Sequence, residues 1–578
     1  MRQIYETIDR QGFQWVVVLV AGVGFFLDGY TLFASNIALP MIQYVYWQDD
    51  TSSRRTTLIN IATLAGTLLG QVAFGFLADK NGRKKMYGVE LVMLITATLG
   101  VVMASNGTHN SMSIYAWLLW WRVVVGIGVG ADYPLSAVIT SEFAPTKHRG
   151  RMMATVFFMQ PLGQIAGNLV SLVVIACSRS QGEDDLVRTV DMMWRWVIGI
   201  GVVPGVIATF FRFIIPESPR YLLDIEDDPI KAEFDATTLF NDPVTPSASD
   251  MMDGWNNIPL PALSLSGVRS LDEDTVTCSP VDYATQPATL NSHWPLLKAD
   301  LIRYFWTEGN WRILAATSFC WLLLDFGYYG ISFSSPQFLA KTWGSLHLSG
   351  PAPSWETDDR ANANVYLMFM NTSIHALVIL NAGSFVGGML FIMLAHKVDR
   401  VSLQKYGFLM LAALFIAMGV MFITVHTEGA PAVVLYILGE LLFNLGPNAT
   451  TYIIPAEIFP TRYRATCHGL SAASGKLGSI LVQLFSTYYK FSGEGNAQTI
   501  RYGWVMIVFA ACMILGAAVT HVWIPPVQRR QSGIARFWGG KPETLETLAL
   551  GRLGAGSRYA VRNQASSRGV RTWVTVGE

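Results

Sequence analysis

The sequence predicts an all-α membrane protein with twelve transmembrane helices, arranged as two pseudo-symmetric halves of six. Only 14% of its 578 residues are charged, whereas a soluble domain has roughly 25%. The mean hydropathy is +0.35, and the apolar residues form blocks of about 20 or more, long enough to cross a bilayer as helices. Similar polar motifs also recur at corresponding places in the two halves. These observations exclude a soluble globular protein.

The apolar blocks give the predicted spans in chain order, and basic connections give their orientation. Lys and Arg are concentrated in the connections after the second, fourth, eighth and tenth spans. Because cytoplasmic loops carry the excess of Lys and Arg, these connections and both termini are expected to be cytoplasmic. The predicted spans cover residues 14–38, 57–78, 86–105, 114–135, 152–176, 195–214, 312–335, 366–394, 406–426, 431–454, 466–489 and 502–524.

Two stretches outside the spans divide the chain. One is acidic with clusters of Pro and Ser, and it is expected to be a partly disordered cytoplasmic loop. The other is rich in Gly, Ser and Arg and is expected to be a basic cytoplasmic tail. The predicted organisation is an N-terminal six-helix half at 1–215, the central loop at 216–310, a C-terminal six-helix half at 311–525 and the tail at 526–578.

The two halves share a motif after their fourth span. "SEFAPTKHRG" begins at Ser141 and "AEIFPTRYRA" begins at Ala456, and their ungapped alignment pairs Glu142 with Glu457. A duplicated half, with the site at the midplane between the copies, is the architecture of many transporters. A channel or a receptor does not need this duplication.

Charged residues inside the spans are the first candidates for function. Each costs roughly 2.5–3.5 kcal/mol on insertion scales, so such residues usually face a cavity or one another. Glu90, near the cytoplasmic end of its span, is interpreted as structural, and Arg122 and Glu440 as members of ion pairs within their halves. The remaining candidates for binding cargo and protons are Asp28, Asp132, Asp325 and Lys476.

A second candidate feature is a polar helix face in the seventh span. Trp321, Asp325 and Tyr329 recur every four residues and therefore share one face. With a protonated carboxyl, this face offers three hydrogen-bond donors. Convergent donors with a positive charge nearby suit a buried anion. The aromatic residues could instead be packing groups, and buried amides such as Gln160 and Asn448 could join helices by hydrogen bonds.

Several loop and helix motifs resemble those of the major facilitator superfamily. These are "GFLADKNGRKK" at 75–85, "RVVVGIGVG" at 122–130 and "PESPRYL" at 216–222. "HKVDRVSLQK" at 396–405 is a partial second copy of the first motif. The resemblance implies the major facilitator fold and a cytoplasmic gate, with gating residues Asp79, Arg83, Asp399 and Arg400.

A longer motif is similar to the signature of the phosphate:proton symporter family of fungi and plants. It reads "GADYPLSAVITSE" at 130–142, and "CWLLLDFGYYGI" at 320–331 agrees with the same family. The resemblance covers about residues 14–525 and implies proton-coupled import of phosphate across the plasma membrane by alternating access. It also implies that phosphate is held by Tyr133, Gln160, Trp321, Asp325, Tyr329 and Asn448, with Lys476 as the nearby cation.

The buried carboxyls suggest how protons would take part. Burial favours the neutral form of a carboxyl, and a proton on Asp325 would remove its repulsion of the anion. Asp28 and Asp132 are assigned to proton handling, and Asp325 both to protons and to phosphate.

Other functions remain open at this point. Pro161 and "ISFSSPQF" at 331–338 depart from the family pattern, which leaves room for a glycerophosphodiester or another organophosphate. A phosphate-sensing transceptor is a further alternative, and regulatory proteins could bind the central loop or the tail. The expected partners are phosphate, protons and the bilayer. The sequence suggests no enzyme, cofactor, metal site or nucleic-acid partner.

Overall fold

A computed structural model describes residues 12–47, 54–145, 147–178, 186–214, 217–222, 301–307, 309–332, 365–425, 430–488 and 496–525. The regular structure of these residues is entirely helical, and eleven of the helices are long and apolar enough to span a membrane. The all-α membrane class is therefore confirmed. Most of the predicted central loop and the whole predicted tail lie outside the described residues, so the domain boundaries stay a prediction.

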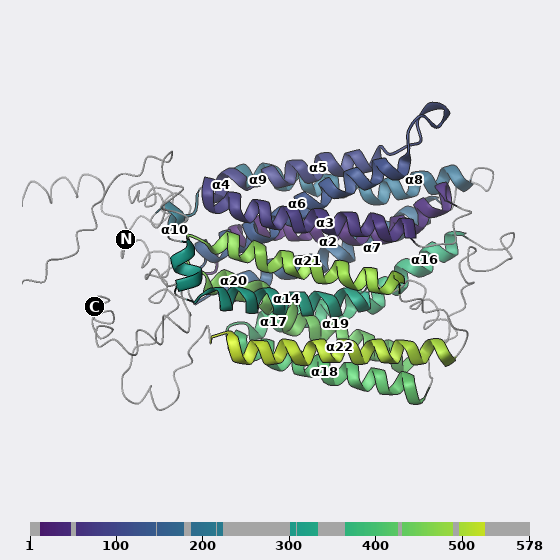
Figure 1. Cartoon of the computed structure of the whole chain (residues 1–578). Helices are drawn as coiled ribbons and strands as arrows, with labels where there is room; N and C mark the ends of the chain where they lie inside the picture. Colours follow the sequence, from purple (N-terminus) through teal and green to yellow (C-terminus); the bar gives the residue numbers. More distant parts are fainter. Residues whose placement is uncertain are drawn as a thin grey trace, which may run out of the picture.

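The helices of the two halves lie side by side with roughly parallel long axes (Figure 1). The first half contains α2 (Trp15–Tyr46), α3 (Arg54–Asn81), α4 (Arg83–Met86), α5 (Val89–Val102), α6 (Ile114–Phe143), α7 (Arg149–Ser178), α8 (Leu186–Gly199) and α9 (Val202–Ile214). The second contains α14 (Trp311–Ser332), α16 (Val365–Ala376), η5 (Leu377–Asn381), α17 (Ala382–Leu394), α18 (Arg400–Thr424), α19 (Ala430–Leu445), α20 (Pro447–Ile458), α21 (Arg464–Tyr488) and α22 (Asn496–Trp523). A short helix, α10 (Pro219–Tyr221), follows the first half, and a π-helical turn, η4 (Arg303–Thr307), precedes the second.

Several helices extend beyond their predicted spans. The first ends at Tyr46 rather than near residue 38, and the fourth ends at Phe143 rather than near residue 135. The predictions followed the apolar run, whereas backbone hydrogen bonding continues into the polar ends of a helix. The helix α7 also continues through Pro161, which it contains in its interior.

The predicted eleventh span is α21, and it is not among the eleven apolar helices. Three polar side chains explain its low hydropathy, since His468, Lys476 and Gln483 are all buried. The helix packs against α14 of its own half and α3 of the other half. These neighbours surround its polar side chains with protein rather than lipid, as required for polar groups at membrane depth.

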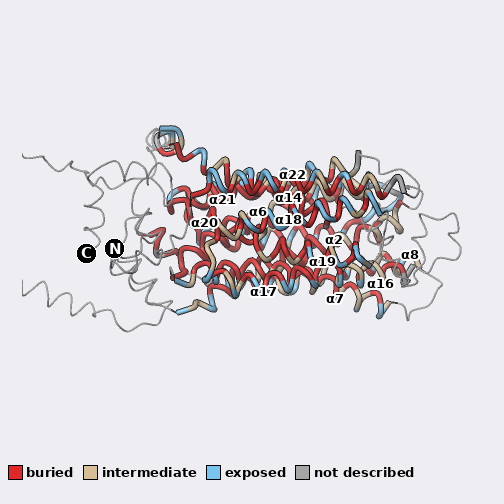
Figure 2. Tube along the Cα trace, turned by 90° about the horizontal axis from the view of Figure 1, so that it is seen from below, coloured by how far each residue is buried: buried red, intermediate tan, exposed pale blue. Residues whose placement is uncertain are grey.

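The two halves repeat the same packing and meet along matching pairs of helices. Within the halves, α2 packs on α7 as α14 packs on α21, and α3 packs on α6 as α17 packs on α19. Between the halves, α3 contacts α21, and α7 contacts α16 and α17. Burial follows this arrangement: α20 is buried along its length, whereas exposed positions recur on the outer sides of α17, α18 and α22 (Figure 2). The basic connections after α3, α6, α17 and α20 define one end of the bundle, here called the basic end.

Candidate transport site

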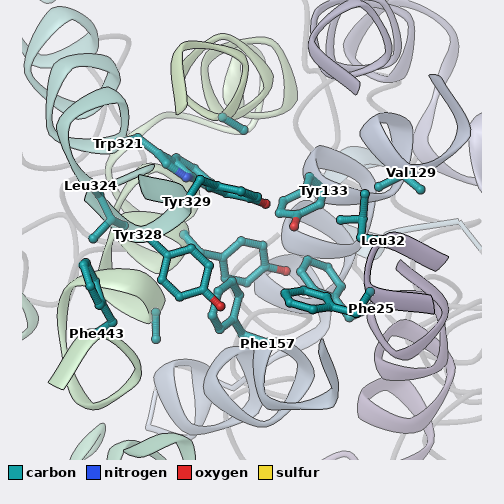
Figure 3. Packing of buried hydrophobic residues seen from close by; sticks show 14 of the residues in the cluster. Phe25, Leu32, Val129, Tyr133, Phe157, Trp321, Leu324, Tyr328, Tyr329 and Phe443 are labelled. Carbon is teal, nitrogen blue, oxygen red and sulfur yellow. The ribbon is translucent and has the colours of Figure 1, made fainter. Parts of the chain in front are cut away.

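A buried lysine lies where the two halves meet. Lys476 of α21 is only 3% exposed, and its Nζ donates to Asp325 Oδ2 at 3.1 Å and to the Tyr329 hydroxyl at 2.8 Å. Its Nζ is also 4.6 Å from the ring centroid of Tyr329 and 5.4 Å from that of Tyr133, which belongs to α6 of the first half. Figure 3 shows the two tyrosines facing each other across the boundary between the halves. The lysine charge is thus balanced by one carboxylate and surrounded by aromatic faces that favour a cation.

Further polar groups extend this centre into both halves. Ser479, one turn after Lys476, donates to Asp325 Oδ2 at 3.2 Å. On the first-half side of the boundary, the Gln160 amide donates to the Tyr133 hydroxyl at 3.1 Å. The sequence analysis did not identify Ser479, although its spacing of three residues from Lys476 places the two on one helix face.

Of the two other predicted phosphate residues, Trp321 belongs to this centre, because its side chain is a hydrogen-bond partner of the Asp325 carboxylate, whereas Asn448 lies at its margin. The Trp321 indole packs against Gly475 of α21 and lies edge-on to His468, with centroids 5.5 Å apart. Asn448 is half-buried, and its amide donates to Asn444 Oδ1 at 3.2 Å. Among the described residues no hydrogen bond joins Asn448 to the lysine centre. The phosphate-binding role of all these residues stays a prediction.

Aromatic rings close the site toward the basic end. Phe25 of α2 and Phe157 of α7 lie 5.1 and 5.2 Å, centroid to centroid, from Tyr452 of α20. Phe25 also lies 5.1 Å from the Tyr133 ring. Tyr452 contacts His468, two turns nearer the basic end than Lys476. Rings from both halves therefore separate Lys476 from the basic end.

A separate group of charges lies inside the first half. Arg212 of α9 forms ion pairs with Asp132, at 2.8 Å, and with Glu90. Its guanidinium stacks 4.2 Å from the ring centroid of Tyr87. Asp132 additionally accepts a hydrogen bond from Ser136 Oγ at 2.7 Å. The ion pair of Glu90 agrees with the structural role predicted for it. Arg212 is not among the site residues predicted from the sequence, because it lies two residues before the predicted end of its span.

Asp28 differs from its charged neighbours in having no hydrogen-bond or ion-pair partner among the described residues. It is 1% exposed, and neither carboxylate oxygen has a hydrogen-bond partner among the described residues. It interacts electrostatically with Asp132, Arg212 and Lys476. An unpaired carboxylate is costly in such a place, which sets Asp28 apart from the ion-paired Asp132.

Gly24, one turn before Asp28, makes room for the ion pair of Arg212 and Asp132. A Cβ at this position would overlap Arg212 Nη2 and Asp132 Oδ2. We expect Gly24→Ala to separate the pair, to destabilise the protein by about 3 kcal/mol and to reduce transport at least tenfold. Uptake and thermal unfolding of the purified protein would measure both effects. Gly439→Ala is the matched control, because the nearest atom to its Cβ would be 3.5 Å away. Equal behaviour of the two variants would contradict the assignment.

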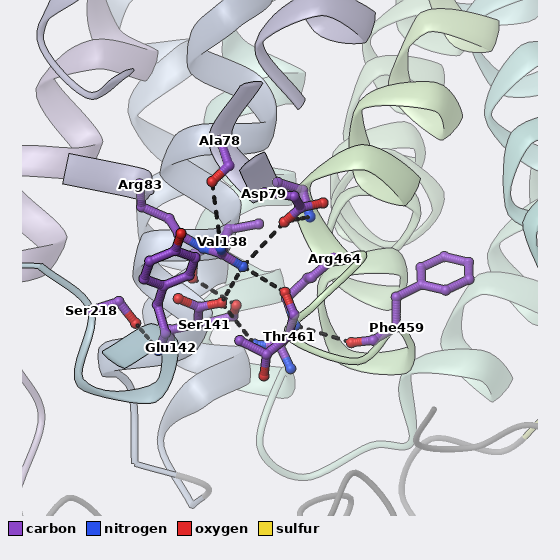
Figure 4. A network of polar contacts seen from close by, with 12 residues as sticks. Ala78, Asp79, Arg83, Val138, Ser141, Glu142, Ser218, Phe459, Thr461 and Arg464 are labelled. Carbon is purple, nitrogen blue, oxygen red and sulfur yellow. Dashed lines mark hydrogen bonds and ion pairs between the residues drawn. The ribbon is translucent and has the colours of Figure 1, made fainter. Parts of the chain in front are cut away.

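At the basic end, a buried polar network joins the halves (Figure 4). Glu142 Oε1 lies 3.3 Å from Arg83 Nη2 in its own half and 3.3 Å from Arg464 Nη1 in the other. Arg83 also donates to the Thr461 carbonyl at 2.5 Å. Asp79 accepts from the backbone N–H and the hydroxyl of Thr466, both at 2.7 Å. These bonds join the two halves at the basic end.

A partial second copy of the network lies in the other half. Arg400 pairs with Glu457 at 3.2 Å and lies against Gly150 of the first half, where a Cβ would overlap its guanidinium. Asp399 caps α18 by accepting from Ser402 N–H at 2.9 Å. Three of the four predicted gating residues, Asp79, Arg83 and Arg400, therefore lie at contacts between the halves. Their gating role stays a prediction.

The loop after α9 braces the network from outside the membrane spans. The Glu217 carboxylate accepts from the backbone N–H of Lys84 at 3.1 Å and from that of Ser218 at 3.1 Å. Burial raises the pKa of Glu217 above its ordinary value, although these N–H groups oppose the shift. The loop thereby fixes the start of α4, from which Arg83 extends.

One predicted ion pair is wrong for the described residues. Arg122 faces Ser35 of α2, to whose hydroxyl its Nη1 donates, and it has no carboxylate partner there. The stretch of α2 that faces Arg122 presents hydroxyl groups rather than an acid. Glu440, the other residue of that prediction, accepts from Ser384 Oγ at 3.0 Å.

Comparisons with known proteins now add to this geometry. The profile of the family described as "Sugar (and other) transporter" matches residues 17–257 and 366–532. The repressible high-affinity phosphate permease of Neurospora crassa is 36% identical over 539 residues, covering 90% of this chain and 87% of that protein. The inorganic phosphate transporter PHO84 of Saccharomyces cerevisiae is 35% identical, covering 92% of this chain and 86% of that protein. The chain belongs to the inorganic phosphate transporter family of the major facilitator superfamily.

Membership of this family confirms the resemblance stated from the motifs. This chain is also similar to inorganic phosphate transporter 1-6 of Oryza sativa, which is 30% identical, with coverage of 94% of this chain and 98% of that protein. The proton:xylose symporter XylE, bound to 6-bromo-6-deoxy-D-glucose, matches its fold with a TM-score of 0.62, 16% identity and coverage of 89% and 96% of the two chains. The protein is therefore a multi-pass transporter with the major facilitator fold, and not an enzyme.

Proposed function

We propose that the protein imports inorganic phosphate together with protons across the plasma membrane, by alternating access. The named relatives are phosphate transporters, which supports phosphate as the cargo. The observation that carries the proposal is the buried contact of Lys476 with Asp325 and Tyr329, beside Tyr133 of the other half. It combines a cation, a titratable carboxyl and hydroxyl donors at the boundary that alternating access must open.

Charge balance at Lys476 explains why the cargo would bring a proton. The ion pair of Lys476 and Asp325 is neutral, so a phosphate monoanion would leave the buried site with one uncompensated negative charge. Protonation of Asp325 restores neutrality and supplies a donor to the anion. Proton and anion therefore favour each other's binding, which is the thermodynamic requirement for symport.

Protons would reach the site through the first half. Asp28 interacts electrostatically both with Lys476 of the lysine centre and with Arg212 and Asp132. It has no hydrogen-bond partner among the described residues, so it can transfer its proton without first breaking a hydrogen bond to the protein. Asp132 forms an ion pair with Arg212, so it could take up a proton only if that ion pair loosens.

Release to the cytoplasm would require the basic end to open. The Glu142 network and the rings around Tyr452 both join the halves there. Rocking of the halves would separate both layers together, because each contains residues from each half.

Uptake of radiolabelled phosphate tests the proposal in cells without their own phosphate carriers. We expect uptake to rise steeply as the external pH falls from about 7.5 to about 4.5, and to resist a tenfold excess of unlabelled glycerophosphodiester. Weak uptake that the diester suppresses would move the assignment to organophosphates. Intact signalling with little uptake would favour a transceptor. Uptake that is equal at all these pH values would contradict proton coupling.

A further inference from the structure

The structure contains a buried arginine whose charge the described residues do not balance. Arg122 of α6 is 2% exposed. Its Nη1 donates to Ser35 Oγ, while Nε and Nη2 are buried and have no hydrogen-bond partner in the part of the chain that the structure describes. A buried cation is strongly unfavourable without an anion. Four other buried arginines, by contrast, each pair with a carboxylate: Arg83, Arg212, Arg400 and Arg464.

The position of Arg122 connects it with the lysine centre. Tyr133 follows Arg122 by eleven residues on α6, which is about three helical turns, so both side chains leave the same face of the helix. Arg122 lies on that face roughly 16 Å farther from the basic end. On α2, Ser35 follows Asp28 by seven residues, about two turns. Arg122 and Ser35 therefore lie farther from the basic end than Lys476 does, toward the end of the bundle expected to face outside.

The edge of the Arg122 guanidinium that carries Nε and Nη2 has the donor geometry that an oxyanion needs. Nε–H and Nη2–H form one side of the planar fork, and such a pair of parallel donors binds two oxygens of a phosphate or carboxylate at once. The bond from Nη1 to Ser35 occupies the other side and fixes the orientation of this fork.

We propose that Arg122, positioned by Ser35, is a second and outer anion site, which binds phosphate before it reaches Lys476. This inference rests on the proposed function, because it takes phosphate as the cargo. The outer site would concentrate the anion on the external side and transfer it inward along the face shared with Tyr133. A phosphate bound there would supply the negative counter-charge that the described protein residues do not give to Arg122.

Equilibrium binding of radiolabelled phosphate to the purified full-length protein at about pH 5 tests the inference. We expect two equivalents of phosphate per wild-type chain, one in Arg122→Gln and one in Lys476→Gln. Arg122→Lys keeps the charge but loses the fork, and it should weaken the outer equivalent about tenfold. Ser35→Ala keeps the fork but removes the bond that orients it, so it should retain both equivalents with a weaker affinity at the outer one. In uptake, Arg122→Gln should raise the KM for phosphate about tenfold while leaving Vmax within about twofold.

The outcomes separate this inference from the proposed function. One equivalent in the wild type that Arg122→Gln does not change would overturn the outer site and leave phosphate transport standing. No phosphate binding by the wild type would contradict the proposed function itself. If Arg122 only ties α6 to α2, Ser35→Ala and Arg122→Gln should lower the unfolding temperature alike and leave the KM unchanged. If Arg122→Gln does not fold, an unchanged outer affinity in Arg122→Lys overturns the inference.

Discussion

Asp325→Asn is expected to abolish accumulation of phosphate driven by protons, while phosphate binding persists and becomes independent of pH. The carboxylate accepts from Lys476 at 3.1 Å and from Ser479 at 3.2 Å, so it is the acid closest to the cation. An asparagine imitates the protonated acid permanently: it adds no charge against the anion but cannot release a proton. We expect the ratio of uptake at about pH 4.5 to uptake at about pH 7.5 to fall at least tenfold, to near one.

Binding and uptake must be measured separately to test this expectation. Binding of labelled phosphate to the purified variant, across the same pH range, should give one constant affinity for the central site when it is expressed per phosphate monoanion, because free phosphate itself loses a proton near the upper end of the range. Ser479→Ala is the matched control, because it removes one hydrogen bond from Asp325 and keeps the titratable group. All uptake values should be normalised to the protein present at the membrane. Acid-stimulated uptake by Asp325→Asn would show that the coupling proton binds elsewhere.

Glu142→Gln is expected to open the basic end of the transporter. Glu142 Oε1 bridges Arg83 and Arg464 at 3.3 Å each, and all three side chains are buried. Removing one partner of a buried ion pair costs about 3–5 kcal/mol, which would shift the balance between closed and open basic ends by more than about a hundredfold. Phosphate uptake should fall at least tenfold, because the outward-facing state becomes rare.

A native cysteine offers a direct readout of this opening. Cys467 of α21 is fully buried, three residues after Arg464. In protein that retains Cys467 as its single cysteine, a soluble maleimide should label Glu142→Gln at least tenfold faster than the parent. Asp191→Asn is the matched control: it removes an ion pair with Arg195, at 3.0 Å, that is partly exposed and lies within the first half. Equal labelling rates in Glu142→Gln and its parent would sink the proposed gate.

Local spacing in the sequence predicted the part of the site that lies within single helices. Asp325 and Tyr329 share a face because they are four residues apart, and the polar surroundings of Lys476 marked it as unusual. The repeat aligned Glu142 with Glu457, but alignment could not show that Glu142 pairs with Arg464 of the other half. That pair depends on how two helices meet across the molecule.

The ion pairs of the first half show the same limit. The contacts of Arg212 with Glu90 and Asp132 join α5, α6 and α9, and the space for them depends on the missing side chain of Gly24 on α2. The helical periodicity of each segment contains none of this information. Arg122 illustrates the converse error, since an acid partner was predicted where α2 presents Ser35.

The polar character of α21 also bears on how the protein is made. A nascent segment leaves the translocon for lipid according to its own hydropathy, and a central lysine opposes that step by roughly 2.5–3.5 kcal/mol. Because α21 is less apolar than the eleven spanning helices, its insertion depends on a partner that is already in the bilayer. Its neighbours α14 and α3 are synthesised earlier, and α14 brings Asp325 to neutralise Lys476. The pairing of Lys476 with Asp325, which we propose holds the cargo, would therefore also influence when the nascent chain completes its membrane assembly.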